Sequence, residues 1–111
     1  MNAYHAGFIY ELRAANYVRR RGYRLLRRRY RAADGEIDLI ARDGDTLVFI
    51  EVKARPRERL GGGAEAVDWD KMRRLRDAAS VYLARNAPDA ACRFDILEFT
   101  RAGIRYIKNA F

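Results

Sequence analysis

The spacing of apolar residues near the N-terminus predicts a helix from about Tyr4 to Arg21. Apolar residues in this segment recur at intervals of three or four, which is the spacing of one helix face. Gly22 follows directly, and glycine is typical of the position at which a helix stops. The stripe expected to face the core consists of Tyr4, Phe8, Leu12 and Ala15.

A second helix is predicted between Asp68 and about Asn86. Asp68 is suited to the N-cap, because its carboxylate can accept a hydrogen bond from a free N–H group of the first turn. Pro88 lies just beyond the expected end. The stripe expected to face the core consists of Trp69, Met72, Leu75, Ala79 and Leu83.

Five further segments are rich in Ile, Leu, Val, Phe or Tyr and are predicted to be β-strands. They run from Tyr23 to Ala32, Glu36 to Arg42, Thr46 to Arg55, Cys92 to Thr100 and Ile104 to Lys108. The first has two leucines among arginines, which is typical of a sheet edge, whereas the second and third look buried on both faces. The order α-β-β-β-α-β-β predicts an α/β fold with a mixed sheet and helices packed on it.

The length and the remaining loops fit one domain. A chain of 111 residues has room for a single hydrophobic core, so residues 1–111 are expected to form one domain. Between the third strand and the second helix, Pro56 to Ala64 contain three successive glycines among charges. This segment is interpreted as a mobile loop.

Arginine dominates the charge of the chain. Lys and Arg total 23 against 15 Asp and Glu, a formal net charge of +8, and only Lys53, Lys71 and Lys108 are lysines. A guanidinium offers a planar fork of donors that suits phosphate oxygens, so a polyanionic partner is expected. A GC-rich genome would explain the choice of arginine, but not the net charge. No segment approaches the roughly 18 apolar residues of a membrane span, so no membrane partner is expected.

The expected location is the cytoplasm. Glu11 and Arg13 stand where a secretory signal would carry its apolar core, so no export signal is predicted. Cys92 is the only cysteine, which fits a reducing compartment, and it is expected in the core. His5 is the only histidine and is expected at the surface.

The main candidate site lies on the hairpin of the second and third strands. Asp43-Gly44-Asp45 is a strong turn signal. A two-residue turn would place Asp38 directly opposite Glu51, and Glu36 opposite Lys53, with opposed residues on one face of the sheet. A four-residue turn would keep the two carboxylates on one side. A three-residue turn without a bulge would separate them and exclude the site.

Two adjacent carboxylates on this hairpin need a cation. They repel each other, and one of them holds its proton unless a positive charge lies between them. Mg²⁺ or Mn²⁺, which prefer oxygen ligands, would resolve the repulsion, and a substrate phosphate could fill the remaining positions. The alternative is a salt-bridged cluster in which Lys53 neutralises Glu51 or Glu36. The apolar residues around both strands favour the metal, because charges in such a setting need a strong reason.

Glu11 lies on the face that the first helix is expected to bury. Its neighbours at helical spacing carry no charge, and Gly7, one turn earlier, should permit a close backbone approach. A buried carboxylate at this position needs a partner, which the hairpin cluster could supply. The alternative is a partly exposed glutamate at the edge of the stripe.

Basic residues flank the proposed site in the sequence and could contact backbone phosphates. The candidate nucleic-acid contacts are Arg27, Arg28, Arg29, Arg31, Arg55, Arg57, Lys71 and Arg74. For any one of them the alternative is a solvated position on the surface.

The chain resembles the YraN family of small bacterial proteins almost from end to end. The most specific stretches are GEIDLIA and VFIEVKAR, and GFIYELRAANYV, GYRLLRRRYR, GGAEAV, RFDILE and IRYIKNAF agree as well. That family is grouped with the PD-(D/E)XK nuclease superfamily, which has a restriction-endonuclease-like core, and it is similar to archaeal Holliday-junction resolvases. Two departures are Ala54, where threonine is common, and Arg29, where asparagine is common.

The resemblance implies which residues would act. The acidic residue of the superfamily falls on Asp38, its Glu-x-Lys on residues 51–53, and its frequent first-helix glutamate on Glu11. Asp38, Glu51 and the main-chain carbonyl of Val52 would then bind Mg²⁺ or Mn²⁺. Glu11 would hold a second ion or a metal-bound water. Lys53 would orient the attacking water or stabilise the developing charge.

The implied activity is metal-dependent hydrolysis of phosphodiester bonds in DNA, which could be branched or single-stranded. Because resolvases of this fold usually pair two active sites, the resemblance also implies a homodimer. Two alternatives stay open. One is a nucleic-acid-binding module of the same fold that does not cleave. The other is a structural or protein-interaction domain, which would have no affinity for DNA even at low salt.

Overall fold

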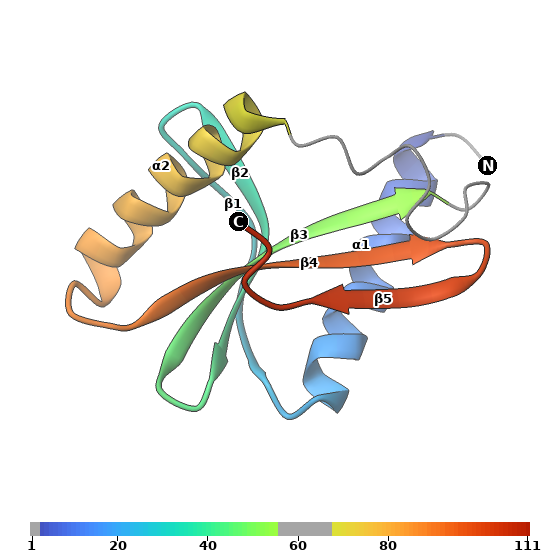
Figure 1. Cartoon of the computed structure of the whole chain (residues 1–111), viewed down its shortest axis with the longest axis horizontal. Coiled ribbons are helices and arrows are strands. Elements are labelled where there is room, and N and C mark those ends of the chain that lie inside the picture. The colour runs from blue at the N-terminus through green and yellow to red at the C-terminus, as the bar shows by residue number, and fades with distance from the viewer. Residues whose placement is uncertain (1–2, 56–67) are drawn as a thin grey trace.

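A five-stranded sheet separates the two helices of the chain (Figure 1). The computed structural model describes residues 3–55 and 68–111. The elements are α1 (Ala3–Arg20), β1 (Arg24–Ala32), β2 (Gly35–Asp43), β3 (Thr46–Arg55), α2 (Trp69–Asn86), β4 (Cys92–Thr100) and β5 (Gly103–Ile107). The predicted order α-β-β-β-α-β-β is confirmed. The loop predicted from Pro56 to Ala64 lies outside the described residues.

The strands follow one another across the sheet in the order β1-β2-β3-β4-β5. All neighbouring pairs are antiparallel except β3 and β4, which are parallel. A parallel pair needs a crossover connection, and α2 lies in the connection between these two strands. The sheet is therefore mixed, as predicted, and β1 lies at its edge.

The register of the central hairpin agrees with the two-residue turn. Asp43 pairs with Thr46, and the antiparallel ladder continues to the pair Leu39 and Ile50. Gly44 and Asp45 therefore form the turn. Extending the same register by one residue brings Asp38 opposite Glu51.

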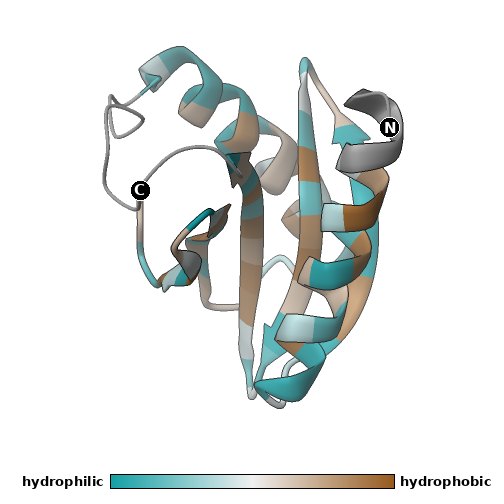
Figure 2. Cartoon of the chain, turned by 90° about the vertical axis from the view of Figure 1, so that its right-hand side faces the viewer, coloured by the Kyte–Doolittle hydropathy of each residue, from teal (hydrophilic) through white to brown (hydrophobic). Residues whose placement is uncertain are grey.

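Each face of the sheet carries its own hydrophobic cluster, and Figure 2 shows the sheet between the two helices. On one face, small and branched residues of α1 pack on the strands; the buried members are Ala14, Val18, Tyr23, Leu39, Ala41, Val48, Ile50, Leu97 and Phe99. On the other face, α2 packs on the sheet; the buried members are Tyr30, Ile37, Ile40, Leu47, Phe49, Met72, Leu75, Ala78, Ala79 and Tyr82. The central strands are thus covered on both sides.

The stripe predicted for α1 is wrong at Phe8 and Leu12 and correct at Ala15. Phe8 and Leu12 are exposed, whereas Ala14, Ala15 and Val18 are buried. The apolar arc of this helix is wide enough for either phase. The alanines let the helix backbone come closer to the sheet than the larger side chains would.

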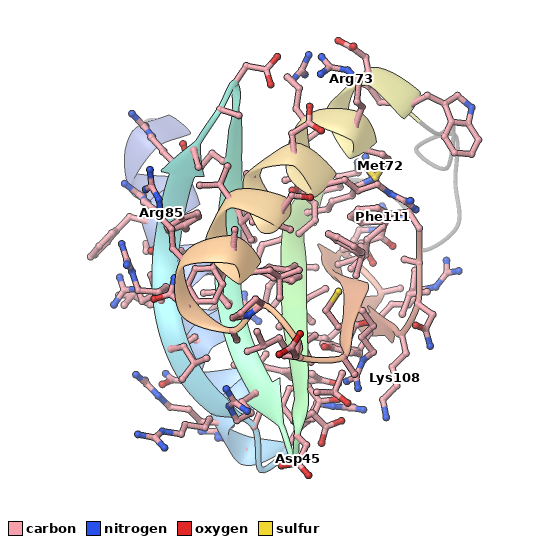
Figure 3. The ribbon with its side chains drawn as sticks, turned by 90° about the vertical axis from the view of Figure 1, so that its left-hand side faces the viewer. Asp45, Met72, Arg73, Arg85, Lys108 and Phe111 are labelled. Atoms are coloured by element: carbon pink, nitrogen blue, oxygen red, sulfur yellow. The ribbon has the colours of Figure 1, made fainter. Side chains whose placement is uncertain are left out.

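Two other predicted core residues are at the surface. Trp69 is exposed, because it is the first residue of α2 and the buried stripe of the helix begins only at Met72. Figure 3 shows Met72 directed toward the sheet, whereas the next residue, Arg73, points away from it. Cys92 is also exposed, since it is the first residue of β4.

Both helix termini follow the sequence signals. At the end of α1, Gly22 has a φ of +87° and its N–H donates to the Arg19 carbonyl at 2.9 Å, while the Tyr23 N–H reaches the Val18 carbonyl at 3.1 Å. At the start of α2, the Asp68 carboxylate accepts the Lys71 N–H at 3.0 Å. In the described part of the chain, neither helix is long and apolar enough to cross a membrane.

Gly35 sets the position of α2 over the sheet. A Cβ added at Gly35 would lie 2.2 Å from the carbonyl oxygen of Arg74, far closer than any atom could be accommodated. The start of β2 and the first half of α2 are therefore in backbone contact. This contact brings the side chains around Arg74 next to the carboxylates of the hairpin.

Candidate active site

Asp38 and Glu51 meet at one cavity on the α2 side of the sheet. The cavity has a volume of about 240 Å³ and lies between the start of β2, the middle of β3 and the first turns of α2. Its lining consists of Asp34, Gly35, Glu36, Asp38, Glu51, Lys71, Arg74 and Leu75. The expectation that the two hairpin carboxylates share one side of the sheet is met.

The Asp38 carboxylate is fixed by the backbone of the neighbouring strand. The Val52 N–H donates to Oδ2 of Asp38 at 2.8 Å, just beyond the last ladder pair of Leu39 with Ile50. Asp38 therefore fills the place where the two strands separate. It lines a second cavity of about 200 Å³ as well, together with Gly7, Glu11, Arg29, Glu36 and Val52.

Glu11 reaches this second cavity from α1, and it is buried, with 8% of the residue exposed. The prediction of a buried carboxylate on this helix face is confirmed. The role given to Gly7 is wrong, because a Cβ added there would meet no atom within 4 Å. The glycine that permits a close approach is Gly35 on the other face.

The partners of Glu11 are arginines of β1. Arg28 Nε donates to one carboxylate oxygen at 3.0 Å, and Arg29 Nε donates to the other oxygen. Neighbouring strand residues normally point to opposite faces, but Arg29 has a φ of +52°, which turns both side chains toward α1. Glu11 and Asp38 border the same cavity, but Glu11 is neutralised by the edge strand and not by the hairpin.

The cation beside Glu51 comes from α2. Lys71 Nζ lies 2.6 Å from Oε1 of Glu51, whose side chain is only 5% exposed. Glu36, by contrast, pairs with Arg31 at 2.8 Å. In the alternative prediction, Lys53 forms a salt bridge with Glu51 or Glu36. The salt bridge is present, but the cation is Lys71 at Glu51 and Arg31 at Glu36.

Lys53 lies farther along β3. It is half-buried and faces Glu98 of β4 in the parallel register. In the part of the chain that the structure describes, it lines neither of the two cavities that Asp38 borders. The structure thus brings together Asp38, Glu51 and Lys71, and leaves Lys53 beside them.

Burial and charge repulsion make Asp38 a weaker acid than an ordinary aspartate. The pKa of Asp38 is raised from 3.8 to about 7, first by burial and then by the negative charge of Glu51. The Val52 N–H and the Lys71 ammonium lower this pKa in part, and Glu36 raises it. A cation that binds in place of the proton would stabilise the ionised form of Asp38.

The donors at the cavity fit a hard divalent ion. Mg²⁺ is commonly held by one or two carboxylates, with water and substrate phosphate in the other positions. Asp38, Glu51 and the carbonyl of Val52 could supply such a set. Within residues 3–55 and 68–111, no group of three or more His, Cys, Asp or Glu side chains converges as a self-sufficient metal site. The arrangement therefore suits an ion whose shell a substrate completes.

Some of the predicted nucleic-acid contacts lie at the two cavities that Asp38 borders. Lys71 and Arg74 line the cavity on the α2 side, and Arg29 lines the cavity on the α1 side. Arg27 is exposed over the ring of Tyr30 at 5.2 Å, and Arg55 pairs with Glu98 at 3.1 Å. Arg57 lies outside the described residues.

Sequence reasoning missed a buried charge network on β4. Asp95 is fully buried and accepts hydrogen bonds from Arg93, from the Tyr106 hydroxyl at 2.6 Å and from the Asn109 N–H at 3.0 Å. Arg93 also reaches Asp43 at 2.9 Å. Burial and the Asp95 carboxylate raise the pKa of Tyr106, so its hydroxyl remains a donor. The sequence signal that could have revealed this network is an aspartate between Phe94 and Ile96 in an apolar strand.

Comparisons with known proteins agree with one family. The sequence model described as "Uncharacterised protein family UPF0102" matches residues 10–99. A UPF0102 protein of Lachnoclostridium phytofermentans is 43% identical, over 100% of this chain and 96% of its own length. Those of Symbiobacterium thermophilum and Shewanella loihica are 47% and 46% identical, each over 91% of this chain and over 91% and 89% of their own lengths.

Proposed function

The chain belongs to the UPF0102 family, also called YraN, and from the geometry of its site we propose that it is a metal-dependent endonuclease acting on DNA in the cytoplasm. The observation that carries the proposal is the pairing of Asp38 with Glu51 at one cavity. A half-buried and a buried carboxylate side by side on adjacent strands are costly to keep for structure alone. A divalent ion and a phosphodiester give them a function.

The residues of the cavity have separate tasks in this proposal. A bound Mg²⁺ or Mn²⁺ supplies positive charge to the phosphate and lowers the pKa of water. Asp38 and Glu51 hold the ion, and the Val52 N–H keeps the Asp38 carboxylate in place. Arg74, on the rim of the cavity, attracts the backbone phosphates of the substrate.

Glu11 acts as a positioning residue in this proposal. Its two oxygens are bonded to Arg28 and Arg29, so it orients two cations beside the cavity on the α1 side. This differs from a role as ligand of a second ion, which the resemblance implies. Cations on both sides of Asp38 would let one DNA backbone pass over the site, with binding that weakens as salt rises.

The net charge of +8 supports a polyanion as substrate. The side chains that support this choice are arginines, whose donors suit phosphate rather than base identity. Branched or single-stranded DNA would be read by shape and charge. A homodimer, with one site for each strand of a junction, would fit such a substrate.

The experiment is a cleavage assay on labelled four-way junctions, flaps, single strands and duplex, with Mg²⁺ or Mn²⁺. The wild type is compared with Glu51→Gln and Glu51→Ala, and Asp89→Asn serves as the control because Asp89 is an exposed carboxylate outside the site. We expect cleavage by the wild type and by Asp89→Asn, and its loss in both Glu51 variants.

Three results would overturn the proposal. If all four proteins bind DNA and none cleaves it, the chain is a binding module of this fold. If the wild type does not bind DNA even at low salt, the chain is a structural or protein-interaction domain. Cleavage that survives in both Glu51 variants would place the chemistry elsewhere.

A further inference from the structure

Lys71 occupies the position from which a cation can act on both the carboxylates and a substrate. Its Nζ lies 2.6 Å from Oε1 of Glu51, and both residues line the cavity that contains Asp38. Glu51 is 5% exposed, whereas the Lys71 side chain is 43% exposed. The ion pair therefore joins a buried carboxylate to a side chain that solvent partly reaches.

The fold fixes Lys71 in this position. Its backbone N–H is bonded to the N-cap residue Asp68 at 3.0 Å, which holds the first turn of α2. One turn later, the carbonyl of Arg74 lies against the backbone of Gly35 at the start of β2. These two contacts place the first turns of α2 over the hairpin carboxylates. Lys71 is thus a built part of the cavity, unlike a surface lysine that reaches the site by chance.

Lys53 lacks these relationships. It follows Glu51 by two residues on β3, but among the cavities formed by the described residues it lines neither of the two that Asp38 borders, and its neighbour across the parallel ladder is Glu98. Within the described residues, the ammonium that contacts a candidate metal ligand is that of Lys71. The Lys71 charge also acts on Asp38, whose pKa it lowers.

We propose that Lys71 is a catalytic residue of this site and that its ammonium contacts a non-bridging oxygen of the phosphate that is cleaved; this inference rests on the proposed nuclease function. An ammonium has three donors. One is directed at Glu51, and the others remain for the phosphate at the cavity opening. A cation aimed at this oxygen stabilises the negative charge that grows on it in the transition state.

Lys71 changes no bond in the reaction. Hydrolysis forms one P–O bond to the oxygen of water and breaks one P–O bond to a sugar oxygen. The attacking water releases its proton to solvent, and the departing sugar oxygen takes a proton from solvent. Lys71 stays protonated throughout and acts by charge and position. Arginine, which is also a cation, should therefore replace it in part, and methionine should not.

The first test observes the lysine ammonium groups directly by proton–nitrogen NMR of the full chain labelled at lysine. Because the chain has three lysines, its spectrum has three side-chain signals, assigned with Lys→Arg variants. The probe is a five-nucleotide thymidine oligomer in the presence of Ca²⁺. We expect a saturable shift of the Lys71 signal and an unchanged signal of the exposed Lys108. A Lys71 signal that stays in place at every concentration of oligomer would overturn the proposal.

The second test compares single-turnover cleavage by the wild type, Lys71→Met, Lys71→Arg and Lys53→Met, with Arg85→Gln as a control for loss of one charge from α2. Arg85 is exposed near the opposite end of that helix from Arg73 (Figure 3). We expect Lys71→Met to lose about a hundredfold or more in rate, Lys71→Arg to recover part of it, and Arg85→Gln to cleave like the wild type. Equal rates for Lys71→Met and the wild type would exclude the role of Lys71.

The two tests separate the two proposals. If the wild type cleaves no substrate, the nuclease function fails, while the NMR titration still decides whether Lys71 contacts a phosphodiester. If the wild type cleaves and only Lys53→Met is inactive, the function stands and the assignment of Lys71 is wrong. Melting temperatures of all variants show whether a loss of rate reflects unfolding.

Discussion

The backbone N–H of Val52 donates a 2.8 Å hydrogen bond to Oδ2 of Asp38, at the point where the ladder between β2 and β3 has ended. One carboxylate oxygen thus takes the place of a strand partner, and Asp38 also lines the cavity that it shares with Glu51. This double use explains why an acidic residue can stay among apolar neighbours. It also ties the ionisation of Asp38 to the stability of the hairpin.

The stability of the metal-free protein should fall as pH rises from about 4 to about 7. Folding raises the pKa of Asp38 from 3.8 to about 7, so between these values the folded chain holds a proton that the unfolded chain has released. Raising the pH across this window therefore lowers the free energy of unfolding, by at most about 1.4 kcal/mol per pH unit. Urea unfolding at several pH values in a chelating buffer measures the slope.

The variant Asp38→Asn supplies the control. Its amide does not ionise but keeps an oxygen for the Val52 N–H, so its stability should depend less on pH across the same window. At pH 8, Mn²⁺ should raise the melting temperature of the wild type, because the ion replaces the proton at the carboxylates, and should not raise that of Asp38→Asn. Parallel pH curves for the two proteins would contradict the role assigned to burial.

The hairpin was predictable because its signals are local. The turn at Gly44-Asp45 and the period of two along both strands fix the register, and with it the common side of Asp38 and Glu51. The partners of the carboxylates were not predictable in this way. Lys71 reaches Glu51 only because α2 packs on the sheet. The sequence contains no local signal for which strand residues a helix far along the chain will cover.

The α1 side shows a second limit of sequence patterns. Glu11 was recognised as buried because its helical neighbours are uncharged, but its bonds to Arg28 and Arg29 depend on a left-handed residue in an edge strand. A period of two predicts that these arginines point to opposite faces. The predicted stripe contained the buried Ala15 but also the exposed Phe8 and Leu12, because short alanines pack more closely on the sheet than larger side chains would.

Replacing Gly35 by alanine should destabilise the protein, whereas Gly7→Ala should not. A Cβ at Gly35 would lie 2.2 Å from a backbone oxygen of α2, so the helix must move, at a cost of about 2 kcal/mol or more. A Cβ at Gly7 meets no atom within 4 Å, and alanine favours the helix by up to about 1 kcal/mol. Thermal unfolding of both variants should give melting temperatures that move in opposite directions. A Gly35→Ala protein as stable as the wild type would show that α2 can shift freely, which the fixed position of Lys71 does not allow.

Asp95 should be essential for stability and not for chemistry. Removing one partner of a buried ion pair commonly costs about 3 to 5 kcal/mol, because the other charge is left uncompensated. We expect Asp95→Asn to lose stability on that scale and Tyr106→Phe, which loses one 2.6 Å hydrogen bond, to lose about 1 kcal/mol. Denaturant unfolding measures both, with the exposed Asp89→Asn as the control. A mild effect of Asp95→Asn would mean that solvent reaches the network.

Salt-dependent DNA binding can decide what Glu11 does. If Arg28 contacts a DNA phosphate, Arg28→Gln should reduce the slope of log K against log salt by about 0.9 for duplex DNA. Arg85→Gln, far from the site on α2, should leave the slope unchanged. Fluorescence anisotropy over a salt series, without divalent metal, gives both slopes.

In the same titration, Glu11→Gln should tighten DNA binding, because it removes a negative charge that competes with phosphate for Arg28 and Arg29. If Glu11 were instead a ligand of a second metal ion, the result would differ. Glu11→Gln would then leave metal-free binding of DNA unchanged and would weaken the binding of Mn²⁺, which calorimetry measures on the same variant. Tighter DNA binding together with unchanged Mn²⁺ affinity would establish Glu11 as the residue that orients the two arginines. The opposite pair of results would restore it to the metal site.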